Sequence, residues 1–180
     1  DELGFESPTP IQEKAIPVIL KGQNDLVVLA QTGTGKTAAF GLPILQLGDN
    51  QADHLQTLVL CPTRELCMQI TKELTKYAQY LHGIKVVPVY GGASINDQIR
   101  ALRKGSQIVV GTPGRVLDMI ERKALKLSGI RWMILDEADE MLNMGFKDDL
   151  DTILAETPKE KQTLLFLVII PAEVAKIARK

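Results

Sequence analysis

The sequence has little of three things that often reveal the class of a protein: cysteine, charge of one sign, and long apolar runs. Two cysteines occur in 180 residues, and neither has a second Cys or a His at metal-ligand spacing, so a zinc site is not expected. The thiols are instead expected to be free, as in the cytoplasm or another reducing compartment. With 21 Lys and Arg against 22 Asp and Glu, the chain does not hold polyanions through bulk positive charge.

No apolar run is long enough to cross a membrane. The longest, residues 164–170, is far shorter than the roughly 20 residues that a membrane-spanning helix needs, and the acidic start Asp1-Glu2 lacks a signal pattern. An apolar share of 45% is sufficient for a core without disulfides or metal. We therefore expect one soluble domain over residues 1–180, without membrane contact.

Short apolar runs alternate with segments of helical period, and the runs look buried on both faces. This alternation predicts an α/β fold with a mostly parallel sheet and helices on both of its faces. In such a sheet, ligands bind beyond the carboxyl ends of the strands. Strands are predicted at 26–30, 57–61, 86–90, 107–111, 132–136 and 163–169, and helices at 64–81, 96–104 and 115–123.

A glycine-rich segment with a Lys-Thr pair follows the first predicted strand and matches a phosphate-binding loop, with alanine at its first position. Backbone N–H groups of such a loop surround phosphates, Lys36 reaches the terminal phosphates, and the Thr37 hydroxyl binds Mg²⁺. The alternative, a glycine-rich turn that begins a helix, leaves the Lys-Thr pair unexplained. The loop consists of Ala30, Gln31, Thr32, Gly33, Thr34, Gly35, Lys36 and Thr37.

An acidic loop follows the predicted strand at 132–136, about 100 residues after Lys36. It reads Asp136-Glu137-Ala138-Asp139. Asp136 is expected to hold Mg²⁺, partly through water, and Glu137 to orient and deprotonate the water that attacks the γ-phosphate. The alternative is a solvated acidic turn. The presence of a phosphate-binding loop in the same chain favours the metal-binding interpretation over this alternative.

These motifs resemble the DEAD-box family of ATP-dependent RNA helicases, which is named after the four letters at 136–139. The resemblance implies a three-layer, RecA-like P-loop NTPase domain that uses ATP and Mg²⁺. Residues 4–12 are similar to the family's Q motif, in which Phe5 would stack on adenine and Gln12 would read its edge. Thr9 to Gln12 also forms a helix-capping box, and the two roles can coexist. Gln12 and the absence of an Asn-Lys-x-Asp tetrad disfavour a GTPase or a small-molecule kinase.

Three further segments resemble family motifs that line an RNA groove. Each follows a predicted strand, where N–H groups, a hydroxyl and an arginine can contact the sugar-phosphate backbone without reading bases. The alternatives are helix caps for the threonines, a turn for the glycine pair and surface charges for the arginines. The residues are Pro62, Thr63, Arg64, Gly91, Gly92, Thr112, Pro113, Gly114 and Arg115.

The resemblance breaks where the family carries Ser-Ala-Thr, a motif whose hydroxyls bond to the last acid of the DEAD box, here Asp139. This chain has Leu167, Val168 and Ile169 instead, and the resemblance resumes directly afterwards, so the three positions changed together, by engineering or selection. If Asp139 relied on those hydroxyls, the carboxylate would lose two hydrogen bonds, and leaving it buried and unpaired would cost about 1–3 kcal/mol or more. If exposed, the apolar run 164–170 would be a surface for self-association.

The resemblance also implies a second RecA-like domain with an arginine finger, which has no counterpart before Lys180. We therefore expect this chain alone to bind adenine nucleotide weakly, to hydrolyse it very slowly and to unwind no RNA. The alternative function is a non-catalytic, ATP-responsive RNA clamp or an engineered interaction scaffold built on the same domain.

Overall fold

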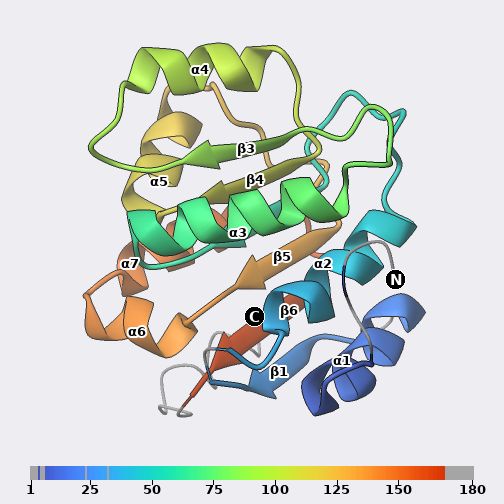
Figure 1. The fold of residues 1–180 in the computed structure, drawn as a ribbon. Coiled ribbons are helices and arrows are strands. Elements are labelled where there is room, and N and C mark those ends of the chain that lie inside the picture. The colour runs from blue at the N-terminus through green and yellow to red at the C-terminus, as the bar shows by residue number, and fades with distance from the viewer. Residues whose placement is uncertain (1–3, 5–6, 23, 32, 169–180) are drawn as a thin grey trace.

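A fully parallel sheet forms the centre of the computed structural model, which describes residues 4, 7–22, 24–31 and 33–168. The described strands follow the order β1-β6-β5-β2-β4-β3 across the sheet (Figure 1). They are β1 (Leu26–Leu29), β2 (Thr57–Leu60), β3 (Val86–Val89), β4 (Ile108–Gly111), β5 (Trp132–Leu135) and β6 (Gln162–Leu167).

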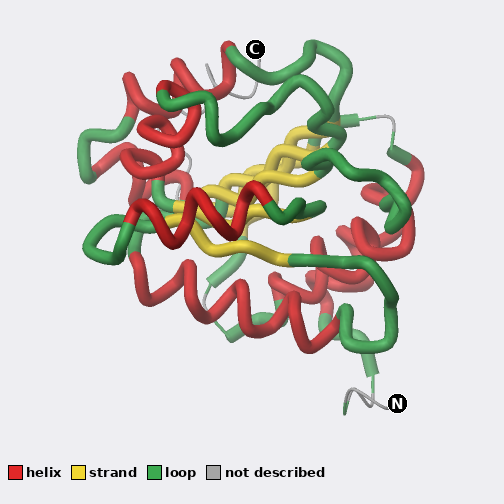
Figure 2. The backbone as a smooth tube through the Cα atoms, turned by 90° about the horizontal axis from the view of Figure 1, so that it is seen from above, coloured by secondary structure: helices red, strands yellow, loops and turns green. Residues whose placement is uncertain are grey.

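Helices cover both faces of this sheet (Figure 2). One face carries α1 (Pro10–Lys21), α2 (Lys36–Leu47) and α3 (Arg64–Tyr77). The other carries α4 (Ile95–Arg103), α5 (Pro113–Glu121), α6 (Ala138–Asn143) and α7 (Lys147–Ala155).

Two apolar cores result, because successive residues of a strand point to opposite faces. In β2, Leu58 and Leu60 join the core beneath α4 to α7, whereas Val59 joins the core beneath α1 to α3. Both cores are closely filled by fully buried side chains, such as Met133 on one face and Ile134 on the other. The predicted α/β fold with three layers is therefore confirmed.

The predicted strands are present, with ends that differ by one or two residues. Burial on both faces is confirmed for β2, β4 and β5, but it is wrong for β1. Within the described residues β1 pairs only with β6, so it lies at an edge, and Val27 and Leu29 are 43% and 59% exposed. None of the helices in the described ranges has the length and apolar character needed to span a bilayer.

Gly111 ends β4 at a point where the backbone of β3 and the side chain of α5 leave no room for a side chain. A Cβ atom at this position would collide with Cγ2 of Val116 and lie 2.9 Å from the carbonyl oxygen of Val89. The close approach lets α5 begin directly beyond the strand. By contrast, a Cβ atom at Gly114 would meet no atom within 4 Å.

We expect Gly111→Ala to lower the free energy of unfolding by about 1–3 kcal/mol, because the added methyl group forces the strand and the helix apart. Gly114→Ala makes the same chemical change in open space and should instead raise it by up to about 1 kcal/mol through the helical preference of alanine. Urea unfolding followed by circular dichroism measures both. Equal midpoints for the two variants would contradict this reading of the packing.

Candidate functional site

The carboxyl ends of all described strands lie along one edge of the sheet, because every neighbouring pair is parallel. The ladder of backbone hydrogen bonds continues one residue past several strands, so the first residue of each functional loop is held by a neighbouring strand. The N–H groups of Ala30, Cys61, Thr112 and Asp136 donate to the carbonyl oxygens of Leu167, Gly111, Val89 and Leu60 at 2.9–3.0 Å.

The strand order divides this edge into two halves. The phosphate loop and the acidic loop follow β1 and β5, and the strand between these two, β6, ends at Leu167, the first of the three altered residues. The predicted RNA-contacting segments follow β2, β4 and β3. The sheet thus gathers the predicted nucleotide groups in one half and the predicted RNA groups in the other.

The phosphate loop turns sharply into α2. Gly33 and Gly35 have φ angles of +85° and +78°, a region that glycine enters without strain, and Gly35 is the N-cap of the helix that begins at Lys36. The helix N-terminus therefore directs its unpaired N–H groups to the hollow of the loop, where they suit an anion. Thr32 lies outside the described residues.

Helix α1 holds the phosphate loop from its outer side. The Thr9 hydroxyl donates to the carbonyl oxygen of Thr34 at 2.9 Å, and the Gln12 amide Nε2 donates to that of Gly35 at 3.1 Å. In a trans peptide the N–H group points opposite to its carbonyl. Holding these carbonyls against α1 therefore turns the following N–H groups away from α1.

Lys36 and Asp136 form a buried ion pair at the centre of the nucleotide half. Lys36 Nζ lies 2.9 Å from Asp136 Oδ1, and the Asp136 side chain is fully buried. Burial raises the pKa of the Asp136 carboxyl, and the positive charge of Lys36 only partly offsets this effect. Asp136 Oδ2 has no hydrogen-bond partner among the described residues. A buried carboxylate oxygen without a partner fits a divalent cation, as expected for Mg²⁺ at Asp136, whereas the Thr37 hydroxyl stays a predicted ligand.

Glu137 has a left-handed backbone, with φ +53° and ψ +49°, where it caps the start of α6. This conformation costs a residue with a side chain about 1–2 kcal/mol, so the surrounding structure holds the acidic turn in place. The side chain is half-buried, and burial raises the pKa of its carboxyl, with Lys36 opposing the shift. A raised pKa brings a carboxylate closer to the range of an effective general base.

The backbone after β6 still provides a hydrogen bond to Asp139, although the hydroxyl-bearing residues are missing. The N–H group of Val168 donates to Asp139 Oδ2 at 3.1 Å. Asp139 is therefore not left unpaired, and the expectation that the substitution strips its partners is corrected to that extent. Leu167 fits the core beside α6, where it is 1% exposed, and Ile169 lies outside the described residues.

The same strand bears on self-association, which was predicted only for the case that residues 164–170 are exposed. The described residues Leu164–Leu167 are buried, because helices cover both faces of the sheet at β6, and Val168 alone of the described part of the run is half-exposed. Self-association stays a prediction.

Gln12 occupies the position predicted for the capping box. Its side-chain Oε1 accepts from the Thr9 N–H group at 3.0 Å, and the Gln12 N–H group points back to the Thr9 hydroxyl. Its Nε2 is committed to Gly35, and the residue is 4% exposed. The capping interpretation is confirmed, whereas the adenine contact stays a prediction. Phe5 lies outside the described residues.

The RNA half brings the three predicted segments close together. Thr63 caps α3, since its hydroxyl accepts from the Leu66 N–H group at 3.2 Å. Thr112 occupies the N-cap of α5 but makes no side-chain capping bond. The Arg64 guanidinium lies 5.0 Å from the centre of the Tyr90 ring, which is a cation–π contact. Arg64 therefore lies beside the turn at Gly91 and Gly92, called the glycine turn below.

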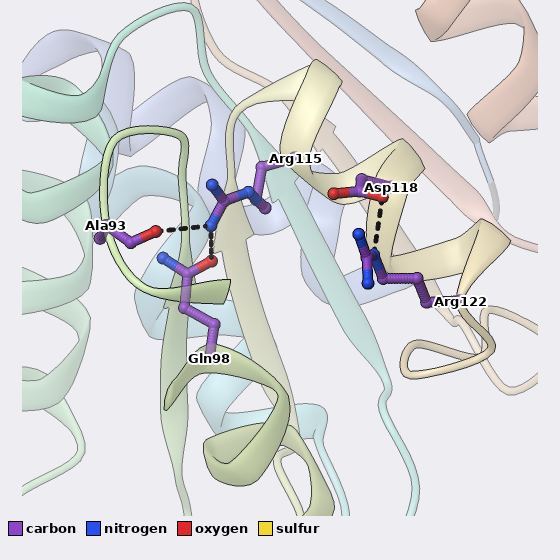
Figure 3. Close-up of polar contacts among 5 residues, drawn as sticks. All are labelled: Ala93, Gln98, Arg115, Asp118 and Arg122. Atoms are coloured by element: carbon purple, nitrogen blue, oxygen red, sulfur yellow. Dashed lines mark hydrogen bonds and ion pairs between the residues drawn. The ribbon is translucent and has the colours of Figure 1, made fainter. Parts of the chain in front are cut away.

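Arg115 is a structural link as well as a charge (Figure 3). Its Nη1 donates to the carbonyl oxygen of Ala93 at 3.1 Å and to Gln98 Oε1 at 2.9 Å. Gln98 was not among the residues predicted from the sequence. The available signal is its place in the predicted helix 96–104, where a polar residue falls on the face that the apolar residues occupy.

The two cysteines are free, as predicted, and the structure buries both. Cys67 Sγ lies 3.1 Å from the carbonyl oxygen of Val110, and Cys61 Sγ lies 3.7 Å from that of Gly111. The hydrogen bond with Cys67, together with burial, raises the pKa of the Cys61 thiol, whereas the same hydrogen bond lowers the pKa of the Cys67 thiol. Cys61 is therefore a packing residue rather than a nucleophile.

We expect Asp136→Asn to change how stability depends on pH. A native pKa above the ordinary value of 3.8 stabilises the fold below that pH, and this contribution is lost as pH rises through the native pKa. Asparagine carries no charge to desolvate, so the variant should gain stability relative to the unchanged protein as the pH rises above about 4, by about 1.4 kcal/mol for each unit of the shift. Urea unfolding at several pH values tests this.

Asp53→Asn makes the same chemical change at an exposed position and is the matched control. A difference between Asp136→Asn and the unchanged protein that stays constant with pH would contradict the raised pKa.

Comparison with known proteins agrees with this arrangement. The chain is 53% identical over 180 residues to ATP-dependent RNA helicase CshA of Listeria monocytogenes, covering 100% of this chain and 34% of that protein. It is 49% identical over 179 residues to ATP-dependent RNA helicase DeaD of Haemophilus influenzae, covering 99% and 29%. The chain thus spans about a third of the length of these curated relatives.

A solved structure shares the fold closely. The DEAD box protein from the hyperthermophile Methanococcus jannaschii superimposes with a TM-score of 0.94 at 44% sequence identity, over 99% of this chain and 48% of that one. A family model described as DEAD/DEAH box helicase matches residues 9–170. The chain therefore belongs to the DEAD/DEAH box helicase family.

Proposed function

We propose that this chain is the ATP-binding, first RecA-like domain of an RNA helicase, in which ATP hydrolysis is coupled to RNA binding. The observation that carries the proposal is the buried pair of Lys36 and Asp136, which joins the phosphate loop to the acidic loop at 2.9 Å. The names of the relatives, ATP-dependent RNA helicases, support the same activity.

In the proposed mechanism, the N–H groups at the start of α2 bind the phosphates. The Lys36 ammonium group leaves Asp136 and pairs with the terminal phosphate instead. Thr37 and Asp136 would hold Mg²⁺, which neutralises phosphate charge during the reaction. Two observations support this role for Asp136: its N–H group is bonded to the Leu60 carbonyl, and its Oδ2 lacks a hydrogen-bond partner among the described residues.

Glu137 is proposed as the base that orients the attacking water and accepts its proton. The Asp136 side chain is fully buried against Lys36, whereas that of Glu137 is half-buried, which supports a role for Asp136 toward the cation and for Glu137 toward the water. Partial burial beside a lysine supports a proton-accepting role near neutral pH.

The RNA half is proposed to bind the sugar-phosphate backbone through loop N–H groups, the free hydroxyl function of Thr112 and the positive charges of Arg64 and Arg115. Such contacts explain how a chain with a net charge of −1 binds RNA, and they carry no base sequence information. A second RecA-like domain would complete the groove and supply an arginine finger, which is worth about 10³–10⁵ in rate. Alone, the chain is expected to be nearly inactive.

A non-catalytic RNA clamp or an engineered interaction scaffold is the second candidate function. The observation that favours it is the apolar segment that begins at Leu167, which lacks the hydroxyls expected for coupling. The buried, free thiols suit a reducing compartment inside the cell for either function.

The nucleotide site can be tested on this chain by calorimetric titration. We expect ATP with Mg²⁺ to bind more tightly than GTP, and Lys36→Ala to weaken ATP binding by about 10- to 100-fold, because a charge-assisted contact to phosphate is lost. Lys72→Ala, on the exposed side of α3, is a surface control. Equal affinity for ATP and GTP, or no loss in Lys36→Ala, would refute the assigned nucleotide site.

Joining the chain to a second RecA-like domain should produce ATPase activity that RNA stimulates, whereas the chain alone should show almost none. Strong RNA-stimulated turnover by the chain alone would refute its proposed dependence on the second domain.

The altered segment can be tested in the same two-domain protein. Leu167→Ser, Val168→Ala and Ile169→Thr together should raise RNA-stimulated turnover if the missing hydroxyls limit coupling. Val168→Ala alone removes apolar surface without adding a hydroxyl and should leave turnover unchanged. The triple change should also lower stability by about 2 kcal/mol or more, because Leu167 is buried. No gain in turnover would remove the segment from the coupling mechanism.

A further inference from the structure

Gln98 is a buried polar side chain on the inward face of α4. The apolar residues Ile95, Ile99 and Leu102 pack against the core from the same helix. Gln98 lies among them and is 8% exposed. A buried amide is destabilising unless both its donor and its acceptor are bonded, so this position requires an explanation beyond packing.

Both ends of the amide are bonded, one to the turn after β3 and the other to the first turn of α5. Nε2 donates to the carbonyl oxygen of Tyr90 at 3.0 Å, and Oε1 accepts from Arg115 Nη1 at 2.9 Å. An arginine only donates and a carbonyl oxygen only accepts, so the amide has a single orientation that satisfies both.

Together with a further bond from Arg115, these hydrogen bonds form a network that fixes both ends of the glycine turn. Arg115 Nη1 donates a second bond to the carbonyl oxygen of Ala93 (Figure 3). The turn is therefore held at Ala93 by Arg115 and at Tyr90 by Gln98. Gly92, between these two anchors, has a φ of +85° and is exposed. Its backbone is therefore displayed to solvent while both of its flanks are fixed.

The network also includes residues of the other two predicted RNA-contacting segments. Arg64, the first residue of the helix α3 that follows β2, stacks on the ring of Tyr90 at 5.0 Å, and Arg115 lies in the first turn of α5, which follows β4. Gln98 thus contacts one side of a cluster that includes groups from all three segments, although it does not itself belong to any of them. Its side chain is too buried to contact RNA directly.

We propose that Gln98 is a positioning residue for RNA binding: it fixes the glycine turn relative to Arg115, so that both meet successive phosphates of one strand. This inference rests on the proposed RNA-binding function. Arg115 then has two tasks, since both N–H groups of Nη1 hold the protein while Nε and Nη2 keep further donors. The positioning is independent of base identity, because the groups it aligns contact only the backbone.

The test compares Gln98→Met with Gln98→Glu. Methionine keeps the length of the side chain but removes both bonds, whereas glutamate keeps the acceptor for Arg115 and loses the donor to Tyr90. Gln69→Met is the matched control, because Gln69 is exposed on α3 and bonds only to Glu73 at 3.4 Å. The readouts are the affinity of this chain for a fluorescein-labelled oligouridine, its affinity for a non-hydrolysable ATP analogue, and hydrogen exchange of the Gly92 and Ala93 amides.

Gln98→Met should weaken RNA binding about tenfold, the effect of losing a hydrogen bond to a charged group, while the affinity for the ATP analogue stays within about twofold. The salt dependence of RNA binding should keep its slope, because no cation that contacts phosphate has been removed. Gln98→Glu should have a smaller effect, and the two amides should exchange faster in both variants. Gln69→Met should match the unchanged protein throughout.

Two results would overturn the inference: RNA affinity equal to that of the unchanged protein, or a loss of RNA and ATP-analogue affinity by the same factor, which indicates general destabilisation. If Gln98→Met does not fold, the RNA and ATP-analogue affinities of Gln98→Glu test the inference by the same two criteria. Absence of RNA binding by the unchanged protein would instead contradict the proposed function. The two failures are therefore distinguishable.

Discussion

The parallel pairing of β5 with both of its neighbours is the constraint on which the functional edge depends. Leu135 is in register with Leu60 on one side and with Leu165 on the other, so the strand is held across its full length. The next N–H group, that of Asp136, continues the ladder to Leu60. β5 is therefore both the support of the acidic loop and the boundary between the nucleotide half and the RNA half. Movement of Asp136 requires movement of a strand that is bonded to both halves.

The predicted nucleotide site contains two features that carry a cost and one set of contacts that holds it in place. Asp136 is buried beside Lys36 and Glu137 has a left-handed backbone, whereas hydrogen bonds from Thr9 and Gln12 hold the carbonyl oxygens of the phosphate loop. None of these is needed to complete the apolar cores. A buried charge and a strained turn persist only where the surrounding structure enforces them, and such features cluster at functional sites. The scaffold thus stabilises a charged site that would not form from local preferences alone.

Sequence patterns were sufficient for the fold class and for the nucleotide loops, because these depend on local features. A buried run followed by glycines and a Lys-Thr pair needs no knowledge of neighbours, and Asp136 follows its strand in the same way. The edge position of β1 depends on strand order, which spacing does not encode, so Val27 and Leu29 were expected to be buried. The hydrogen bond from Val168 to Asp139 is donated by a backbone N–H group. Almost every residue has such a group, so the sequence does not indicate which one will contact Asp139. Gln98 required the tertiary placement of two loops.

The rigidity of β5 has a spectroscopic consequence. Trp132, the single tryptophan of the chain, begins the strand, and Asp136 follows its end, about 13 Å away at the rise of an extended strand. The indole is 3% exposed, and the Arg131 guanidinium lies 4.4 Å from its centre. The molecule thus contains one indole fluorophore, anchored in the same strand that leads to the acidic loop but remote from that loop. Its emission reports the integrity of the central strand while remaining separated from any ligand that binds at the opposite end.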